Sequence, residues 1–156
     1  MGQTAAHNLL LVVHVLAVAM WLGTNIALGV AAARPSPNAE TEAWWAETKG
    51  FIAATVKNTA FLLLLLSGIG MIVEGNGIKF SAPFVSVGFL VVIVGGALTG
   101  AVFMPGARKL AEAHRGGDKE AAARESGRLG MIGAAETLLV VVALLFMVFQ
   151  WGGLGS

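Results

Sequence analysis

The sequence predicts an all-α integral membrane protein, a single domain over residues 1–156 in which four membrane-spanning helices form a bundle. Hydrophobic residues make up 56% of the 156 residues and charged residues only 12%, whereas about a quarter of a soluble domain is charged. The mean hydropathy is +0.79. Four apolar runs each reach the roughly 20 residues that a helix needs to cross a bilayer: about 9–33, 51–73, 84–104 and 131–151.

The first span carries a line of polar side chains. His7, His14, Trp21 and Asn25 follow one another at intervals of seven, seven and four residues, which places them on one helical face. A histidine and an indole are costly in hydrocarbon and mark a functional site by default. At this depth His14 favours the axial ligand of a b-type haem, or a metal ligand. The alternative is a packing histidine that is hydrogen-bonded to a neighbouring helix.

The other members of this line allow two interpretations each. His7 lies about 10.5 Å from His14 along the helix axis, too far for both to bind one metal ion. Both rings leave the same face, so they cannot take the two sides of one haem. His7 is therefore a ligand to a second cofactor or an interfacial residue. Trp21 could border a porphyrin or pack with an internal hydrogen bond. Asn25 suits an interhelical hydrogen bond or a polar cofactor edge.

The second and fourth spans each contain one charge, Lys57 and Glu136, at similar depths from the side where both helices enter. Lone charges at such depths are expensive, so the sequence predicts a buried ion pair between these residues. The functional alternative is a proton or anionic-substrate site that opens to the cytoplasm, with Asn58 and Thr137 beside it. Lys57 could also extend to the membrane interface.

The third span contains a G-x-x-x-G pair, Gly96 and Gly100. Small residues at this spacing let membrane helices approach closely, either within the bundle or across a homodimer, and we expect a homodimer. A parallel two-fold dimer would place both copies of His14 at the same depth, on either side of one haem. A five-coordinate haem is the alternative.

Basic residues predict the orientation in the membrane. Only Lys79 lies on the side of the N-terminus, whereas the two loops on the opposite side carry Arg34, Lys49, Arg108, Lys109, Arg115, Lys119, Arg124 and Arg128. The positive-inside rule places these loops in the cytoplasm and both termini outside. The expected location is the cell inner (cytoplasmic) membrane, which the chain crosses several times.

Both cytoplasmic loops contain signals for helix starts. Ser36 and Asn38 are candidate N-caps before the second span, and Asp118 is a candidate before the fourth. Helix-forming residues also continue beyond Pro105 at the end of the third span. We therefore expect the second, third and fourth helices to project beyond the bilayer on the cytoplasmic side.

Several function classes are excluded by composition. The chain has no cysteine, which excludes disulfides, thiolate metal sites and cysteine nucleophiles. Its net charge of +1 and the lack of a basic stripe argue against nucleic acid as a partner. The sequence contains no H-E-x-x-H, Walker or G-x-S-x-G motif.

At HVLAVAMWLGTNIA, with His14, Trp21 and Gly23, the chain resembles the group of small helical membrane proteins that includes CopD-like copper-resistance domains and HemJ-type protoporphyrinogen oxidases. KNTAFLLLLLSGIGM looks like the basic start and apolar run of their second helix, and MPGARKLAEA is similar to the exit of their third. The resemblance implies a four-helix bundle with His14 as haem ligand. It also loosely matches Lys57 to the basic residue that starts their second helix.

The sequence thus predicts a membrane protein with haem b near the outer face, working in electron transfer or redox chemistry with a quinone or a redox partner. The sixth ligand is not obvious, because Met71 and Met147 lie nearer the surface than His14 and methionines in apolar helices usually fill the core. Two alternatives remain: a CopD-like copper-handling component, and a non-catalytic accessory subunit of a larger membrane complex.

Overall fold

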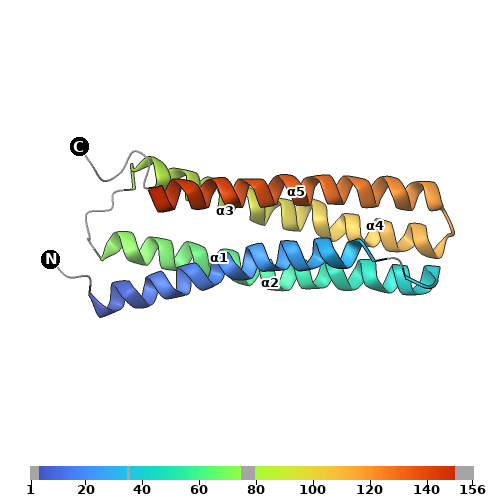
Figure 1. Ribbon diagram of the computed structural model, residues 1–156, viewed down its shortest axis with the longest axis horizontal. Helices are drawn as coiled ribbons and strands as arrows, with labels where there is room; N and C mark the ends of the chain where they lie inside the picture. Colours follow the sequence, from blue (N-terminus) through green and yellow to red (C-terminus); the bar gives the residue numbers. More distant parts are fainter. Residues whose placement is uncertain (1–3, 35, 75–79, 150–156) are drawn as a thin grey trace.

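The computed structural model describes residues 4–34, 36–74 and 80–149. These ranges are all helical, without strands. Figure 1 shows the helices as long rods that run side by side. They are α1 (Ala5–Ala32), α2 (Ala39–Val73), α3 (Pro83–Leu98), the short π-helical segment η1 (Thr99–Phe103), α4 (Met104–Arg115) and α5 (Lys119–Phe149).

The four predicted spans are confirmed, because α3, η1 and α4 together form one span, Pro83–Arg115. Each span is long and apolar enough to cross a membrane. At most 28% of the most apolar window of any span is buried inside the molecule, and large side chains such as Leu9, Phe51 and Val148 point outward. Such a surface suits contact with lipid and indicates a multi-pass membrane protein.

The helices extend beyond the apolar runs, as the capping signals predicted. Asn38 caps α2, because its side chain accepts a 2.9 Å hydrogen bond from the backbone N–H of Thr41; Ser36 does not serve as the cap. Asp118 accepts a 2.9 Å bond from Ala121 at the start of α5. Gly117 before it has a φ of 71°, which favours glycine. The predicted end of the fourth span, at residue 151, lies outside the described residues.

The third span passes a proline by widening its helix. The N–H of Met104 bonds to the carbonyl of Thr99, five residues back, which defines the π-helical turn. Pro105 follows directly; it has no N–H, and its ring would collide with the carbonyl four residues earlier in a regular α-helix. A π turn is a known way to accommodate such a defect. The span therefore continues as α4 instead of ending at the proline.

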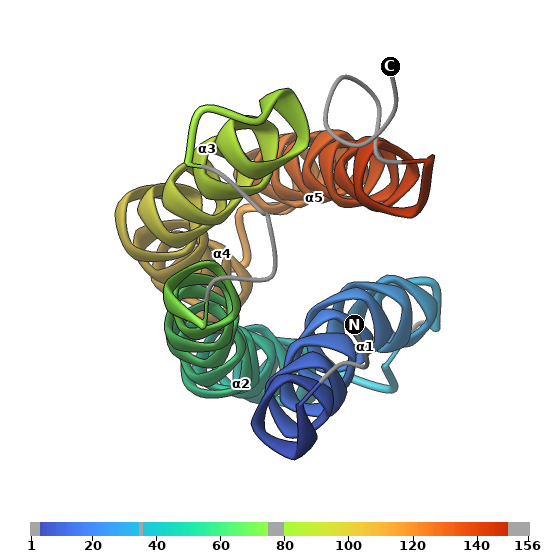
Figure 2. The same ribbon diagram turned by 90° about the vertical axis from the view of Figure 1, so that its left-hand side faces the viewer.

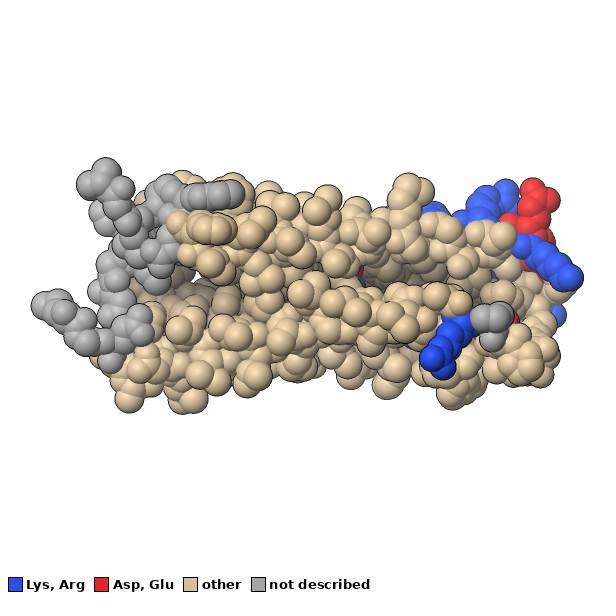
Figure 3. Space-filling view, in the orientation of Figure 1, with Lys and Arg blue, Asp and Glu red and all other residues tan. Residues whose placement is uncertain are grey.

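The bundle is closed on three sides and looser on the fourth. In end view, α1 lies against α2, α2 against α3 and α4, and these against α5 (Figure 2). By contrast, α1 and α5 contact each other only sparsely. We call the line between α1 and α5 the α1–α5 seam. Figure 3 shows the molecular surface hollowed along it.

Charged side chains gather at one end of the molecule, where α1 and α4 end and α2 and α5 begin (Figure 3). We call this the basic end, and the opposite end, where α1 begins, the N-terminal end. Lys79, the one basic residue predicted on the other side, lies outside the described residues. Orientation relative to the cytoplasm is taken up below.

Within the bundle, Gly95 of the third span has a tight contact that Gly96 and Gly100 do not have. A methyl group added at Gly95 would lie 2.4 Å from the Trp21 ring, whereas one added at Gly96 would make ordinary contact with Phe61. A methyl group at Gly100 would meet nothing within 4 Å. Gly95 therefore allows the third span to pack against the Trp21 ring of α1.

Candidate functional site

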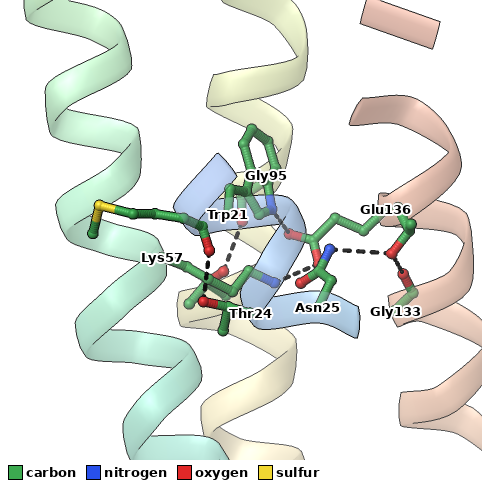
Figure 4. A network of polar contacts seen from close by, with 10 residues as sticks. Trp21, Thr24, Asn25, Lys57, Gly95, Gly133 and Glu136 are labelled. Carbon is green, nitrogen blue, oxygen red and sulfur yellow. Dashed lines mark hydrogen bonds and ion pairs between the residues drawn. The ribbon is translucent and has the colours of Figure 1, made fainter. Parts of the chain in front are cut away.

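A buried carboxylate joins three helices near the middle of the bundle. Glu136 of α5 is 1% exposed and makes an ion pair with Lys57 of α2, which is also 1% exposed. From α1, the indole N–H of Trp21 donates to Oε1 of Glu136 at 3.3 Å. The Asn25 amide donates to Oε2 at 3.5 Å. Figure 4 shows these side chains converging on Glu136, which we call the Glu136 cluster.

The side chains of the ion pair and their neighbours have further polar and aromatic contacts. The Lys57 ammonium lies 4.4 Å from the centre of the Phe103 ring, a cation–π contact. Asn25 also donates to the Thr137 hydroxyl at 3.2 Å. Among the described residues, no buried side-chain nitrogen or oxygen lacks a hydrogen-bond partner. The charges that the sequence places at equal depth thus meet and neutralise each other in a low-dielectric environment.

Trp21 serves as packing and as a donor at the same time. Its ring is 2% exposed and contacts the Phe61 ring edge-on, with centroids 4.5 Å apart. Its one N–H is engaged by Glu136. An indole has no second donor, so this N–H does not reach a cofactor edge while the bond to Glu136 is made.

His14 is held by a serine of the neighbouring helix. Its Nδ1 lies 2.9 Å from the Ser67 hydroxyl oxygen of α2. That hydroxyl also lies within hydrogen-bond distance of the Leu63 carbonyl. A serine has one proton, so when the carbonyl accepts it, Nδ1 of His14 carries the ring proton and donates to Ser67. Nε2 then keeps its lone pair and is the nitrogen able to bind a metal.

A cavity of about 330 Å³ lies between α1, α2, α3 and α5 toward the N-terminal end. We call it the histidine cavity, because His7 and His14 both line it. Trp21, Met71 and Met147 contribute to the walls, and most of the remaining lining is aliphatic or aromatic. Its volume falls within the range of about 300–1,000 Å³ typical of small-molecule and cofactor sites.

His7 lines this cavity from the first turn of α1. His7 is 5% exposed, and its Nδ1 lies 4.0 Å from a Glu74 carboxylate oxygen. That carboxylate also accepts hydrogen bonds from the Thr4 hydroxyl at 3.0 and 3.1 Å. His7 thus takes part in a polar group that joins the start of α1 to the end of α2.

A second cavity of about 470 Å³ occupies the α1–α5 seam toward the basic end. Asn25, Lys49, Lys57 and Thr137 line it, and we call it the lysine cavity. Asn25 therefore belongs to a different cavity from His7, His14 and Trp21, although all four share one face of α1. The Glu136 cluster stands between the two cavities, with Trp21 on one side and Asn25 on the other.

The ligating side chains of the histidine cavity suit a group that needs one or two protein ligands better than a bare metal ion that needs three or more. In the described ranges, no three His, Asp or Glu side chains come together in a way that could hold a metal. His14, whose ring is held by Ser67 in an apolar cavity, is a residue that could hold a group bound through one histidine. Met71 and Met147 are the further side chains with ligating atoms that line the same cavity.

Ser67 is the site residue that the sequence reasoning missed. It is the only polar side chain in the run AFLLLLLSGIGMIV of the second span, and that isolation was the available signal. A hydroxyl in such a run can bond to its own helix backbone, so its isolation alone did not predict a contact with His14.

Comparison with family models, with curated proteins and with solved structures finds no match to this chain. The resemblance to the CopD-like and HemJ-type group therefore rests on the short motifs of the first three spans.

Proposed function

We propose that this protein is a b-type haem protein of the membrane that works in electron transfer or redox chemistry, with His14 as the axial ligand in the histidine cavity. The observation that carries the proposal is that Nδ1 of His14 is engaged by Ser67 while the ring lines an apolar cavity. Bound haem would supply one-electron transfer.

The chain's own residues define what this cavity can do. Ser67 holds the orientation of the His14 ring through the contact with Nδ1, as outer-shell partners of metal-binding histidines do. The aliphatic and aromatic walls exclude water, which tunes the potential of an iron centre. Met147 lines the same cavity and could also help to hold the group: a methyl group added at Gly88 would lie 2.5 Å from its terminal carbon, so glycine at that position gives Met147 its room.

Replacement of His14 tests the ligand. We expect His14→Ala to abolish most bound haem, measured as the Soret absorbance per purified protein, because the proposed ligand is removed and the other imidazole of the cavity, His7, lies beside Glu74 near the start of α1. Ser67→Ala should keep haem but lower its affinity, by about 10- to 100-fold if the outer-shell contact behaves as in other metal sites. His7→Ala is the control and should keep most of the haem. Unchanged haem content in His14→Ala would refute the proposal.

Copper handling is the second candidate, favoured by one observation. His14, Met71 and Met147 line one cavity, and imidazole with thioethers is a donor set that suits Cu(I). A colourless protein that binds Cu(I), and loses it in Met147→Leu, would replace the haem proposal with this one.

The proposal includes an orientation and partners. We place the basic end in the cytoplasm and both termini outside, in the inner membrane, because eight Lys and Arg residues of the sequence fall at one end. A homodimer and a quinone or protein redox partner belong to the same proposal. The outward position of Gly100, with no atom within 4 Å of an added methyl group, offers a surface where a second copy could pack.

The orientation has a direct test. A reporter that is active only outside the cytoplasm, such as a phosphatase that needs disulfides, should be active when fused after Ser156 and inactive when inserted after Gly116. The opposite pattern would invert the orientation. It would leave the arrangement of the helices untouched.

A further inference from the structure

The lysine cavity has a polar residue at each end and apolar walls between them. Lys49 lies near the basic end, and Lys57 of the Glu136 cluster lies deeper on the same helix. Eight residues separate them, so the two levels are about 12 Å apart along α2. Ile26, Ala53 and Leu129 are among the side chains that line the space between them. The cavity is thus an elongated apolar slot.

The charge of this slot comes from Lys49. The lining includes two lysines and no carboxylate, but Lys57 is neutralised by Glu136. In the part of the chain that the structure describes, no carboxylate oxygen lies within 4.0 Å of the Lys49 ammonium. Lys49 is only half-buried. Lys49 therefore presents a positive charge that is not paired with a carboxylate, at the end of the slot toward the basic end.

Glycines make the room in this slot. A methyl group added at Gly29 of α1 or at Gly130 of α5 would meet nothing within 4 Å, and both residues line the cavity. They belong to the two helices of the α1–α5 seam, which contact each other only sparsely and along which Figure 3 shows the surface hollowed. The slot therefore opens sideways, toward the lipid that surrounds a membrane bundle.

We propose that the lysine cavity binds an amphiphile with an acidic headgroup, a carboxylate or a phosphate, which pairs with Lys49 while its apolar chain lies in the slot. An apolar slot holds the chain by burial, and a basic side chain near the membrane surface attracts anionic headgroups. The deep end is closed by the Glu136 cluster, whose polar atoms already have partners. This site does not depend on haem in the histidine cavity.

A spin-labelled fatty acid and its methyl ester test the proposal in the full-length protein. In nanodiscs of phosphatidylcholine, the acid should show an immobilised component in its electron spin resonance spectrum and bind about fivefold more tightly than the ester. Lys49→Gln should remove that preference. Equal binding of acid and ester to the unchanged protein would overturn the proposal.

Two matched glycine pairs locate the site. Gly130→Leu fills the slot and should remove the immobilised component, whereas Gly127→Leu on the same helix should retain it, because Gly127 also has open space but does not line the cavity. Gly29→Leu and Gly23→Leu repeat the comparison on α1. If the two substitutions of a pair change the immobilised component equally, the ligand binds elsewhere and the proposal is wrong.

A competition distinguishes the two sources of such a ligand. Phosphatidylglycerol added to the nanodiscs should displace the labelled acid if the natural ligand is a phospholipid of the bilayer. If the acid stays bound in excess phosphatidylglycerol, the site selects a single-chain acid. Both results support an acidic amphiphile and identify its class.

Discussion

Lys57→Met, with Glu136 left in place, is expected to lower the free energy of unfolding by about 3–5 kcal/mol. Both side chains are 1% exposed, so removal of the lysine leaves a buried carboxylate without its counter-charge. The cost of that uncompensated charge, and not the loss of attraction itself, dominates the effect. Thermal unfolding in detergent is the measurement.

A double-mutant cycle with Glu136→Gln separates the pair from other effects. Glutamine carries no charge and keeps an oxygen that can accept from Trp21. The double variant, Lys57→Met with Glu136→Gln, therefore leaves no buried charge unpaired and should cost less than the sum of the single changes. Lys49→Met is the matched control: this lysine of the same helix is half-buried and has no ion pair within the described ranges, so we expect a change within about 0.5 kcal/mol. Strict additivity would show that Lys57 and Glu136 do not interact.

The second large effect is expected from Gly95→Ala. The new methyl group would lie 2.4 Å and 2.7 Å from two carbons of the Trp21 ring and 3.1 Å from Phe61. The indole cannot swing away freely, because the Phe61 ring packs edge-on against it and Glu136 holds its N–H. Overpacking of this kind costs about 1–3 kcal/mol. A lower unfolding temperature, with an altered near-ultraviolet circular dichroism spectrum of the tryptophans, would report it.

Gly100→Ala is the control for that substitution. It is the same chemical change five residues along the span, in a place where the methyl group meets nothing within 4 Å. Its effect should be small. Both variants are compared as monomers in detergent; if Gly100→Ala is then as destabilising as Gly95→Ala, the assignment of Gly95 as the tight contact is wrong.

Hydropathy predicted the fold class because each span must satisfy its backbone within a helix and face lipid. The same reasoning placed Lys57 and Glu136 at one depth, since charges that enter from the same side by similar numbers of residues reach the same level. The caps at Asn38 and Asp118 were predictable because the bond from a cap to the first turn is local.

The contacts that shape the site depend on which helix faces which, and periodicity within one helix does not contain that information. His7, His14, Trp21 and Asn25 share a face of α1, yet Glu136 divides them between two cavities. Trp21 allowed a cofactor or a packing role, and only the position of α5 shows its N–H bonded to Glu136. Within the bundle the tight glycine contact of the third span is at Gly95, whereas Gly100 faces outward, and the sequence alone did not distinguish these neighbouring glycines.

The distance between Lys57 and Glu136 along the chain affects how the protein is made. These residues are 79 positions apart, and synthesis at about 5–20 residues per second separates them by roughly 4–16 s. During that interval α2 exists without the counter-charge of its lysine. The last helix supplies it, and Trp21 and Asn25 of the first helix bond to the same carboxylate. A nascent chain that has not yet inserted α5 therefore holds Lys57 in an apolar helix without the carboxylate that neutralises it in the finished bundle.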